Sequence, residues 1–394
     1  MPETARACPN CHTTLPLGAS FCYVCGTATP PSIDRATGEF VSPSGPSLSL
    51  DEMARRLRRV LGASYDLGDT IGSGGFAIVF KARDVRLKRE VAIKVARPEF
   101  SLDAQMLQRF RREAEAIAAL RHTHILPIFD VGEGEGLAYI VMPFVHGESL
   151  KARLEREPKL PVPLARRILL QAADALGTAH EVGLVHRDVK PDNIMLERRG
   201  DRVLLMDFGI AKAVDAGIDG TSGPLTSTGL VIGTPHFMSP EQAMGERALD
   251  HRTDQYALAV VAYRMLAGVL PFDGPTIRAV LTKQLVGECE PLTRVRPEVP
   301  EALSAAIARA MAKEPNDRFA TMDDFAAAVR ADPDYVSEML ASHASGAFPP
   351  LATRETPREG APVAAEDATG GTGAARGGER RATPPTHTTE TGVG

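Results

Sequence analysis

Four side chains that can hold a metal ion or move a proton lie in one short stretch of the chain, His186 to Gly209. Asp188, Lys190 and Asn193 precede a short apolar run, and Asp207 follows a second one after a turn. This pattern predicts a β-hairpin, and because a hairpin returns its ends to the same place, we expect the four side chains to converge. Carboxylate and amide oxygens suit Mg²⁺, and one carboxylate remains to act as a base. The alternative is a pair of acidic loops that only solvate the hairpin.

A glycine-rich turn lies upstream, between two runs with strand-like alternation. Gly72, Ser73, Gly74 and Gly75 form this turn, and Lys94 ends the later run Val-Ala-Ile-Lys. Glycines let backbone N–H groups approach phosphate oxygens because no side chain stands in the way. A strand would aim Lys94 beneath the turn, toward the α- and β-phosphates of a nucleotide. The glycines alone are a weak signal, whereas the glycines followed by this lysine are a specific one.

Four of the five cysteines form two Cys-X-X-Cys pairs near the N-terminus, and Cys289 stands alone. Two such pairs have the spacing of a tetrahedral metal site, and residues 7–27 are similar to a zinc ribbon. So small a segment has no core, so metal binding must supply its folding energy. His12 is an alternative to one cysteine, but adjacent ligands fit one tetrahedron poorly. The predicted ligands of a structural Zn²⁺ are Cys8, Cys11, Cys22 and Cys25.

Composition and charge place the chain among ordinary globular proteins. Its 394 residues are 43% hydrophobic and 24% charged, with a net charge of −5 that gives no support for nucleic-acid binding. No apolar run approaches the ~20 residues of a membrane span, and no signal-peptide core is visible, so we expect a cytoplasmic protein. Residues 28–50 are expected to be a flexible linker, Asp51 to Leu61 a short helix with a solvated arginine face, and residues 345–394 a disordered tail.

The order of the motifs resembles that of the protein kinase family. His-Arg-Asp, then Asn193, then Asp-Phe-Gly are similar to the catalytic and metal-binding loops of a kinase. Lys190 and Thr234 resemble the Ser/Thr branch, and the chain as a whole resembles the bacterial, eukaryotic-like (Hanks-type) Ser/Thr kinases. The resemblance implies an α+β, bilobal fold over residues 65–330. It would comprise a β-rich N-lobe with one long helix (65–143) and a helical C-lobe (146–330).

The resemblance also implies a role for each matched residue. Asp188 would accept the proton of the substrate hydroxyl, Lys190 would offset charge on the phosphoryl group, and Thr234 would hydrogen-bond both. Glu113 would hold Lys94 in place, with Glu115 as the alternative. Asn193 and Asp207 would hold Mg²⁺ or Mn²⁺. Met142 would be the gatekeeper of the adenine site, next to a hinge that begins at Pro143. The residues implied to bind ATP are Ile71, Gly72, Ser73, Gly74, Gly75, Val79, Ala92, Lys94, Met142, Pro143, Val145, Asn193 and Asp207.

Other matched residues imply regulation and support. Arg187 is typical of kinases whose activation segment is ordered by a phosphate, because a guanidinium binds phosphate bidentately. Thr226 and Thr228 occupy the positions of activating threonines, with Thr221, Ser222 and Ser227 as alternatives. The residues implied to support the fold are Glu241 paired with Arg318, and Asp254 bracing the catalytic-loop backbone.

Two departures from the kinase pattern keep another function open. Ala77 replaces the third glycine of the turn, and Pro143 removes a backbone donor from the hinge. The second hypothesis is therefore a pseudokinase or zinc-ribbon scaffold that binds partners without catalysis. The expected partners are proteins with Ser/Thr hydroxyls, a protein bound by the ribbon, and a transient second copy for autophosphorylation. A weaker hypothesis makes the ribbon a nucleic-acid tether.

Overall fold

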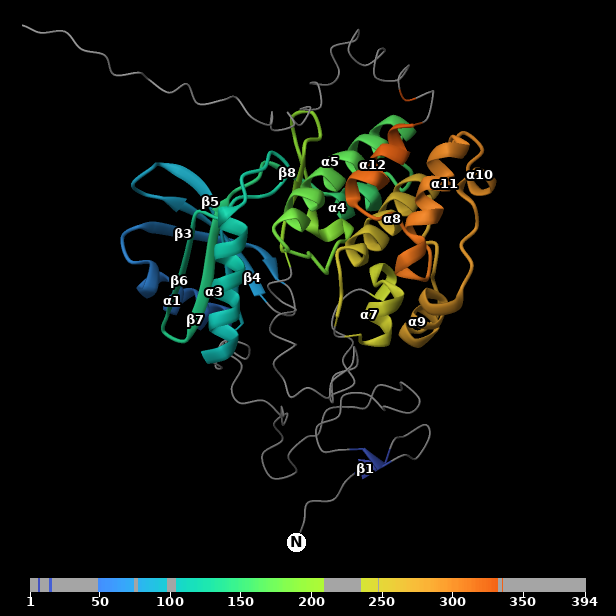
Figure 1. The fold of residues 1–394 in the computed structure, drawn as a ribbon. Helices are drawn as coiled ribbons and strands as arrows, with labels where there is room; N and C mark the ends of the chain where they lie inside the picture. Colours follow the sequence, from blue (N-terminus) through green and yellow to red (C-terminus); the bar gives the residue numbers. More distant parts are fainter. Residues whose placement is uncertain are drawn as a thin grey trace, which may run out of the picture. The chain divides into compact units, whose positions relative to one another are not determined.

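A computed structural model gives the fold of the chain. It describes residues 6–7, 14–15, 49–73, 77–97, 104–208, 235–246, 248–331 and 335, without the side chains of residues 6–7, 14–15, 104–110 and 113. The described regions form a sheet-bearing N-lobe and a helical C-lobe (Figure 1).

The N-lobe is built on a five-stranded antiparallel sheet with the order β3-β4-β5-β7-β6. Successive side chains of a strand point to opposite faces, so β5 directs Ile93 to one face and Lys94 to the other. The strands are β3 (Tyr65–Ser73), β4 (Ala77–Asp84), β5 (Arg89–Ala96), β6 (Asp130–Gly134) and β7 (Leu137–Pro143).

Two helices pack on this sheet. Helix α3 (Ala104–Ala119) buries Ala114 and Ile117 in the core that also contains Ile140 of β7. Helix α1 (Leu50–Leu61) joins a separate core with the other set of alternating side chains, including Phe80 and Ile93. The two faces of the sheet therefore pack against different helices. Lys94 lies on the face that packs against α3.

Helix α1 is more firmly attached than the sequence suggested. Ser49 caps its N-terminus by accepting a hydrogen bond from the Glu52 N–H, and Met53 and Leu57 are completely buried. Its arginines were expected to be solvated, but Arg59 forms a 2.9 Å ion pair with Glu135 in the β6–β7 turn. The helix is thus part of the N-lobe core.

The C-lobe is organised around two long helices, α5 (Val162–Glu181) and α8 (Arg252–Ala267). Helix α8 is buried on nearly all sides, as expected of a helix that is apolar around most of its circumference. The remaining elements are α4 (Leu150–Arg156), α7 (Pro240–Met244), α9 (Ile277–Val286), α10 (Leu292–Val295), α11 (Glu301–Ala310), α12 (Met322–Arg330) and the 3₁₀ turns η1 (Pro191–Asn193), η2 (Pro235–Phe237) and η3 (Pro315–Asp317).

A small sheet of three strands contains the hairpin that was predicted within residues 186–209. Its order is β10-β9-β8, from β8 (Gly147–Ser149), β9 (Ile194–Glu197) and β10 (Val203–Leu205). The predicted hairpin is present, with Ile194 opposite Leu205 at its base. Gly147 permits β8 to approach closely, because a Cβ there would overlap the Leu196 carbonyl group.

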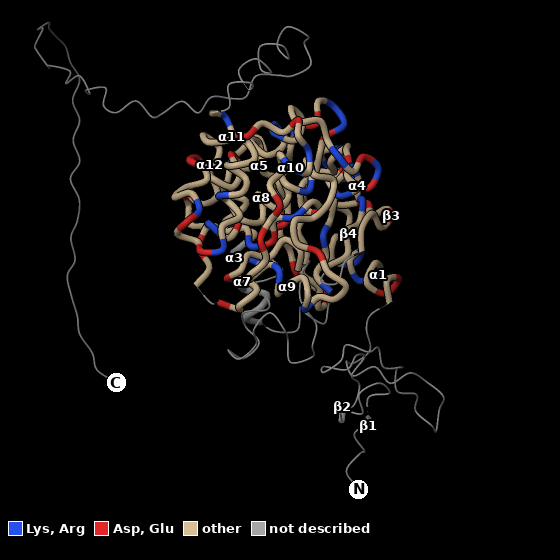
Figure 2. Tube along the Cα trace, turned by 90° about the vertical axis from the view of Figure 1, so that its right-hand side faces the viewer, with Lys and Arg blue, Asp and Glu red and all other residues tan. Residues whose placement is uncertain are grey.

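Charges of both signs alternate over the described trace, with no extended region of one sign (Figure 2). None of the helices within the described ranges is long and apolar enough to cross a membrane. Near the N-terminus, β1 (Arg6–Ala7) pairs antiparallel with β2 (Thr14–Leu15).

Candidate active site

The loop before the hairpin orients the carboxylate of Asp188. Lys190 Nζ lies 2.7 Å from Asp188 Oδ2, and Asn193 Nδ2 donates to the same oxygen at 3.0 Å. Asn193 Nδ2 also donates to the Asp188 carbonyl oxygen at 2.8 Å. The 3₁₀ turn η1, which begins with Pro191, brings Asn193 back toward Asp188. Asp188 is partly exposed and held by a cation and an amide.

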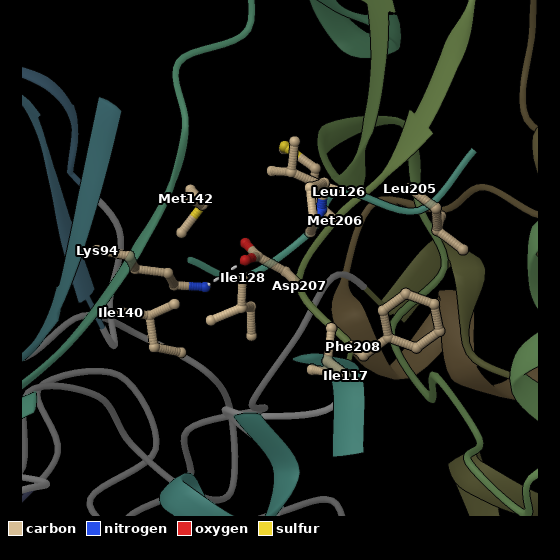
Figure 3. Close-up of a pocket in the computed structure, with 11 residues that line it drawn as sticks. Lys94, Ile117, Leu126, Ile128, Ile140, Met142, Leu205, Met206, Asp207 and Phe208 are labelled. Atoms are coloured by element: carbon tan, nitrogen blue, oxygen red, sulfur yellow. Dashed lines mark ion pairs between the residues drawn. The ribbon is translucent and has the colours of Figure 1, made fainter. Parts of the chain in front are cut away.

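A second carboxylate, Asp207, lies at the end of the hairpin and meets Lys94 of β5. Lys94 Nζ lies 2.7 Å from Asp207 Oδ1, and the two side chains point toward each other (Figure 3). Burial opposes the charge of Asp207, but the positive charge and hydrogen bond of Lys94 outweigh it, so the Asp207 pKa is lowered. The site therefore keeps an ionised carboxylate next to a lysine.

The two carboxylate-bearing segments are joined by hydrogen bonds. The Met206 N–H donates to the Asn193 carbonyl oxygen at 2.9 Å. His186 Nε2 donates to the Met206 carbonyl oxygen at 2.8 Å, and the His186 ring lies 4.6 Å from the Phe208 ring, centroid to centroid. The sequence pattern indicates no separate role for His186, because only the folded hairpin brings Met206 against it.

Two functional residues have backbone conformations that side chains other than glycine rarely adopt. The φ angle is 61° at Arg187 and 58° at Asp207. Left-handed conformations at non-glycine residues cost free energy and persist where the surroundings hold them. The neighbours of Arg187 and Asp207 must therefore supply that support.

Asp254, at the N-terminus of α8, supplies part of this backbone support. Its Oδ2 accepts the His186 N–H and its Oδ1 accepts the Arg187 N–H, both at 2.7 Å. His180 Nε2 donates to Oδ2 at 2.8 Å. Burial opposes the charge of Asp254, but the hydrogen bonds and charges of His180 and His186 together outweigh it, so the Asp254 pKa is lowered. This is the backbone bracing that the sequence led us to expect of Asp254.

Glu241 and Arg318 form a bidentate, buried ion pair. Arg318 donates through its two terminal nitrogens to the two carboxylate oxygens of Glu241, at 2.8 Å each. Thr253 Oγ1 adds a hydrogen bond to Glu241 at 2.7 Å. The pairing expected of these two residues is thus present, and it ties α7 to η3 and α8.

The pocket beside Lys94 is lined mainly by apolar side chains (Figure 3). Met142, the expected gatekeeper, lies on β7 at the pocket wall, and Pro143 ends the same strand. Pro143 and Val145 are half-buried at the start of the link to the C-lobe. The lining residues are Lys94, Ile117, Leu126, Pro127, Ile128, Ile140, Met142, Leu205, Met206, Asp207 and Phe208.

The described part of the glycine turn lies at the end of β3. Gly72 pairs with Val79 of β4, and Ile71 is 47% exposed. A Cβ on Gly72 would lie 3.7 Å from the Val79 Cβ, an ordinary contact, so the strand pairing does not require glycine there. Arg97 donates to the Ser73 hydroxyl at 3.3 Å, and Ala92 is buried on β5. Glycine at position 72 leaves the backbone N–H groups unobstructed by a side chain, as the predicted phosphate-binding turn requires.

Several predicted residues lie outside the described part of the chain. No cluster of three or more His, Cys, Asp or Glu side chains suited to a metal occurs among the residues that the structure describes. The predictions outside these residues concern the four zinc cysteines, the activation segment, part of the glycine turn and the side chain of Glu113. The residues concerned are Cys8, Cys11, Cys22, Cys25, Gly74, Gly75, Thr226, Thr228 and Thr234, together with the side chain of Glu113.

A family model described as the protein kinase domain matches residues 65–328. The chain belongs to the protein kinase family, and the predicted bilobal kinase fold is confirmed. A crystal structure of the Mycobacterium tuberculosis PknI kinase domain is similar, with 32% identity, a TM-score of 0.53, and coverage of 68% of this chain and 96% of that one.

Bacterial proteins named as Ser/Thr kinases are also similar to this chain. Serine/threonine-protein kinase pkn3 of Myxococcus xanthus is 40% identical over 279 residues, 69% of this chain and 50% of pkn3. PrkC of Bacillus subtilis is 38% identical over 276 residues, 70% of this chain and 41% of PrkC. The chain thus aligns with half or less of the length of these curated relatives.

Proposed function

We propose that this chain transfers the γ-phosphoryl group of ATP to serine and threonine hydroxyls of proteins. The observation that carries the proposal is the pair of oriented carboxylates. Asp188 is held by Lys190 and Asn193, and Asp207 is paired with Lys94 beside an apolar pocket. Relatives named as Ser/Thr protein kinases support the choice of acceptor.

Each side chain has a distinct task in the proposed reaction. Asp188 orients the substrate hydroxyl and takes its proton as the oxygen bonds to the γ-phosphorus and the bond to ADP breaks. Lys190, 2.7 Å from Asp188, offsets the charge on the group in transit. Lys94 orients the α- and β-phosphates. In phosphoryl transfer, positioning and electrostatic stabilisation supply most of the rate.

The donor set fits Mg²⁺ or Mn²⁺. The Asn193 amide nitrogen is committed to Asp188, which leaves the amide oxygen for a cation, and Asp207 supplies an ionised carboxylate. When bound, the ion would neutralise phosphate charge. Asn193 and Asp207 are joined through the Met206 hydrogen bond, so the chain itself holds the two proposed ligands together.

Replacing the base tests the proposal. We expect Asp188→Asn to lower kcat by at least ~10²-fold, because an amide cannot accept the proton. Asp192→Asn is a matched control from the same loop, whose exposed carboxylate contacts Lys151 instead. Transfer of labelled phosphate from ATP to dephosphorylated casein is the measurement. Near wild-type turnover in Asp188→Asn would remove the assigned role.

A phosphate on the activation segment is the proposed switch. We propose that phosphate on Thr226 or Thr228, placed there by a second copy of the chain, pairs with Arg187 and orders the segment. The double variant Thr226→Ala/Thr228→Ala should then stay at the activity of phosphatase-treated wild type after incubation with Mg²⁺ and ATP. Full activity of the double variant would contradict the switch.

We also propose that residues 7–27 form a zinc ribbon that docks a protein partner of a cytoplasmic kinase. The spacing of the four cysteines supports a tetrahedral sulfur site, and the β1–β2 pairing brackets Cys8 and Cys11. Elemental analysis of the purified chain should find one zinc per molecule. Cys22→Ser should lose it, whereas Cys289→Ser should keep it.

A further inference from the structure

The peptide group between Arg187 and Asp188 is held on both sides. Its carbonyl oxygen, on Arg187, accepts a hydrogen bond from Gln242 Nε2 at 2.8 Å. Its N–H, on Asp188, donates to His186 Nδ1 at 3.3 Å. The φ angle of 61° at Arg187 makes this peptide costly to maintain without such partners. Asp188 directly follows this peptide group. The plane of the peptide group therefore sets the direction in which the Asp188 side chain leaves the backbone.

Gln242 is held to Ser239 through both its side chain and its backbone. The side-chain Oε1 accepts the Ser239 N–H at 3.1 Å, and the backbone N–H of Gln242 donates to Ser239 Oγ at 3.3 Å. These two bonds form the capping box of helix α7. The amide is therefore fixed with its NH₂ toward Arg187, and the residue is 91% buried, with an exposed fraction of 9%.

Helix α7 is anchored to the C-lobe independently of the catalytic loop. Glu241, the residue before Gln242, is bound bidentately by Arg318. The Ser239 hydroxyl lies 3.3 Å from the Thr253 hydroxyl, and Thr253 begins the turn of α8 that carries Asp254. Gln242 thus extends from a rigid support, at the end of the proposed activation segment, to the peptide that precedes the proposed base.

We propose that Gln242 is a positioning residue for phosphoryl transfer. Its N–H donor fixes the Arg187–Asp188 peptide and makes the placement of Asp188 depend on the ordering of residues 239–242. This inference depends on the proposed role of Asp188. Asp254 holds the N–H groups of residues 186 and 187, and Gln242 holds the following carbonyl, so the two side chains restrain successive peptide groups.

Gln242→Glu separates this task from capping. A glutamate keeps the length of the side chain and the oxygen that accepts the Ser239 N–H, so helix α7 retains its cap. An ionised glutamate offers no donor to the Arg187 carbonyl and places a negatively charged oxygen against it. We expect kcat to fall by about tenfold, the size expected for a lost buried hydrogen bond, with the KM for ATP within twofold of wild type. The matched control is Met244→Ala in the same helix, whose side chain is 58% exposed.

The assay is transfer of labelled phosphate to dephosphorylated casein, with thermal unfolding recorded for each variant. A kcat of Gln242→Glu within twofold of wild type would overturn the inference, as would a loss that only follows the fraction of unfolded protein. If Gln242→Glu does not fold, Gln242→Met is measured instead. Methionine lacks the donor and also the oxygen that accepts the Ser239 N–H, so its loss of kcat is compared with its loss of thermal stability, and a kcat within twofold of wild type overturns the inference. Asp188→Asn is measured alongside. A wild-type chain that transfers no phosphate removes the proposed function, and an active Asp188→Asn removes the assigned role of Asp188. An inactive Asp188→Asn with a fully active Gln242→Glu removes only this inference.

Discussion

Lys94 and Asp207 form the ion pair at the centre of the proposed nucleotide site. The two side chains form a 2.7 Å ion pair. Burial raises the Asp207 pKa, but Lys94, together with His186 and Lys190, lowers it by more, so the Asp207 pKa lies below its ordinary value. The proposed reaction needs both groups for ATP, Lys94 for the phosphates and Asp207 for the metal. Nucleotide and metal would therefore have to replace part of this ion pair with contacts of their own.

Asp207→Asn should reduce the metal dependence of nucleotide binding. The neutral amide is a weaker Mg²⁺ ligand than a carboxylate, so the gain in ATP affinity on adding Mg²⁺ should shrink by about tenfold or more. Lys94→Met should weaken ATP binding both with Mg²⁺ and with EDTA, because it removes a charge that meets the phosphates directly. Calorimetric titration with ATP under both conditions measures the two effects. An unchanged Mg²⁺ dependence in Asp207→Asn would contradict the assignment of Asp207 as a metal ligand.

Helix α1 shows what an element outside the family match contributes. It precedes residue 65, where the match to the kinase domain begins, yet Met53 and Leu57 are completely buried in the N-lobe core. The core on this face also contains Phe80, Ile93 and Val141 of the sheet. We therefore propose that the stable N-lobe unit begins at the cap, Ser49.

Leu57→Ala should destabilise the N-lobe by about 2–5 kcal/mol, because it removes a buried side chain and leaves a cavity between α1 and the sheet. Arg58→Ala, at the next position on an exposed face, should change the free energy of unfolding by less than about 0.5 kcal/mol. Urea unfolding of both variants measures the difference. Equal stability of the two variants would mean that α1 does not belong to the folding unit.

At the scale of the whole molecule, the buried pair of Glu241 and Arg318 joins α7, α8 and η3. Burial opposes the charge of Glu241, but the hydrogen bond and charge of Arg318 outweigh it, so the Glu241 pKa lies below its ordinary value of 4.5. A carboxyl group with a lowered pKa in the folded state contributes stability above its unfolded pKa. That contribution is lost as the pH falls through the folded pKa. The pKa values of Asp254 and Asp207 are also lowered, so the free energy of unfolding should decrease as the pH falls below about 4.5.

Arg318→Met should cost about 3–5 kcal/mol at pH 7, because it leaves Glu241 buried and unpaired. Without Arg318, burial raises the Glu241 pKa, so the variant should lose less stability than wild type between pH 7 and pH 5. Arg330→Ala, an exposed arginine, is the control and should behave as wild type at both pH values. Urea unfolding at the two pH values tests this, and a penalty for Arg318→Met that grows toward pH 5 would contradict it.

The sequence by itself predicted the hairpin and the convergence of Asp188, Lys190, Asn193 and Asp207, and its resemblance to the protein kinases implied the fold class. It could do so because glycine turns, strand alternation and the order of polar residues are local patterns with a fixed geometric meaning. The Lys190 and Asn193 contacts with Asp188 are of this kind, since they span two and five residues.

Only the tertiary structure decided which distant groups hold that site in place. Gln242 reaches a carbonyl 55 residues earlier in the chain, and Arg59 pairs with a glutamate 76 residues later. No local sequence pattern identifies such partners, because a buried arginine or glutamine can have the same kinds of sequence neighbours as an exposed one. The burial of α1 and the support of the Arg187–Asp188 peptide both arise from packing between segments that the chain brings together only when folded.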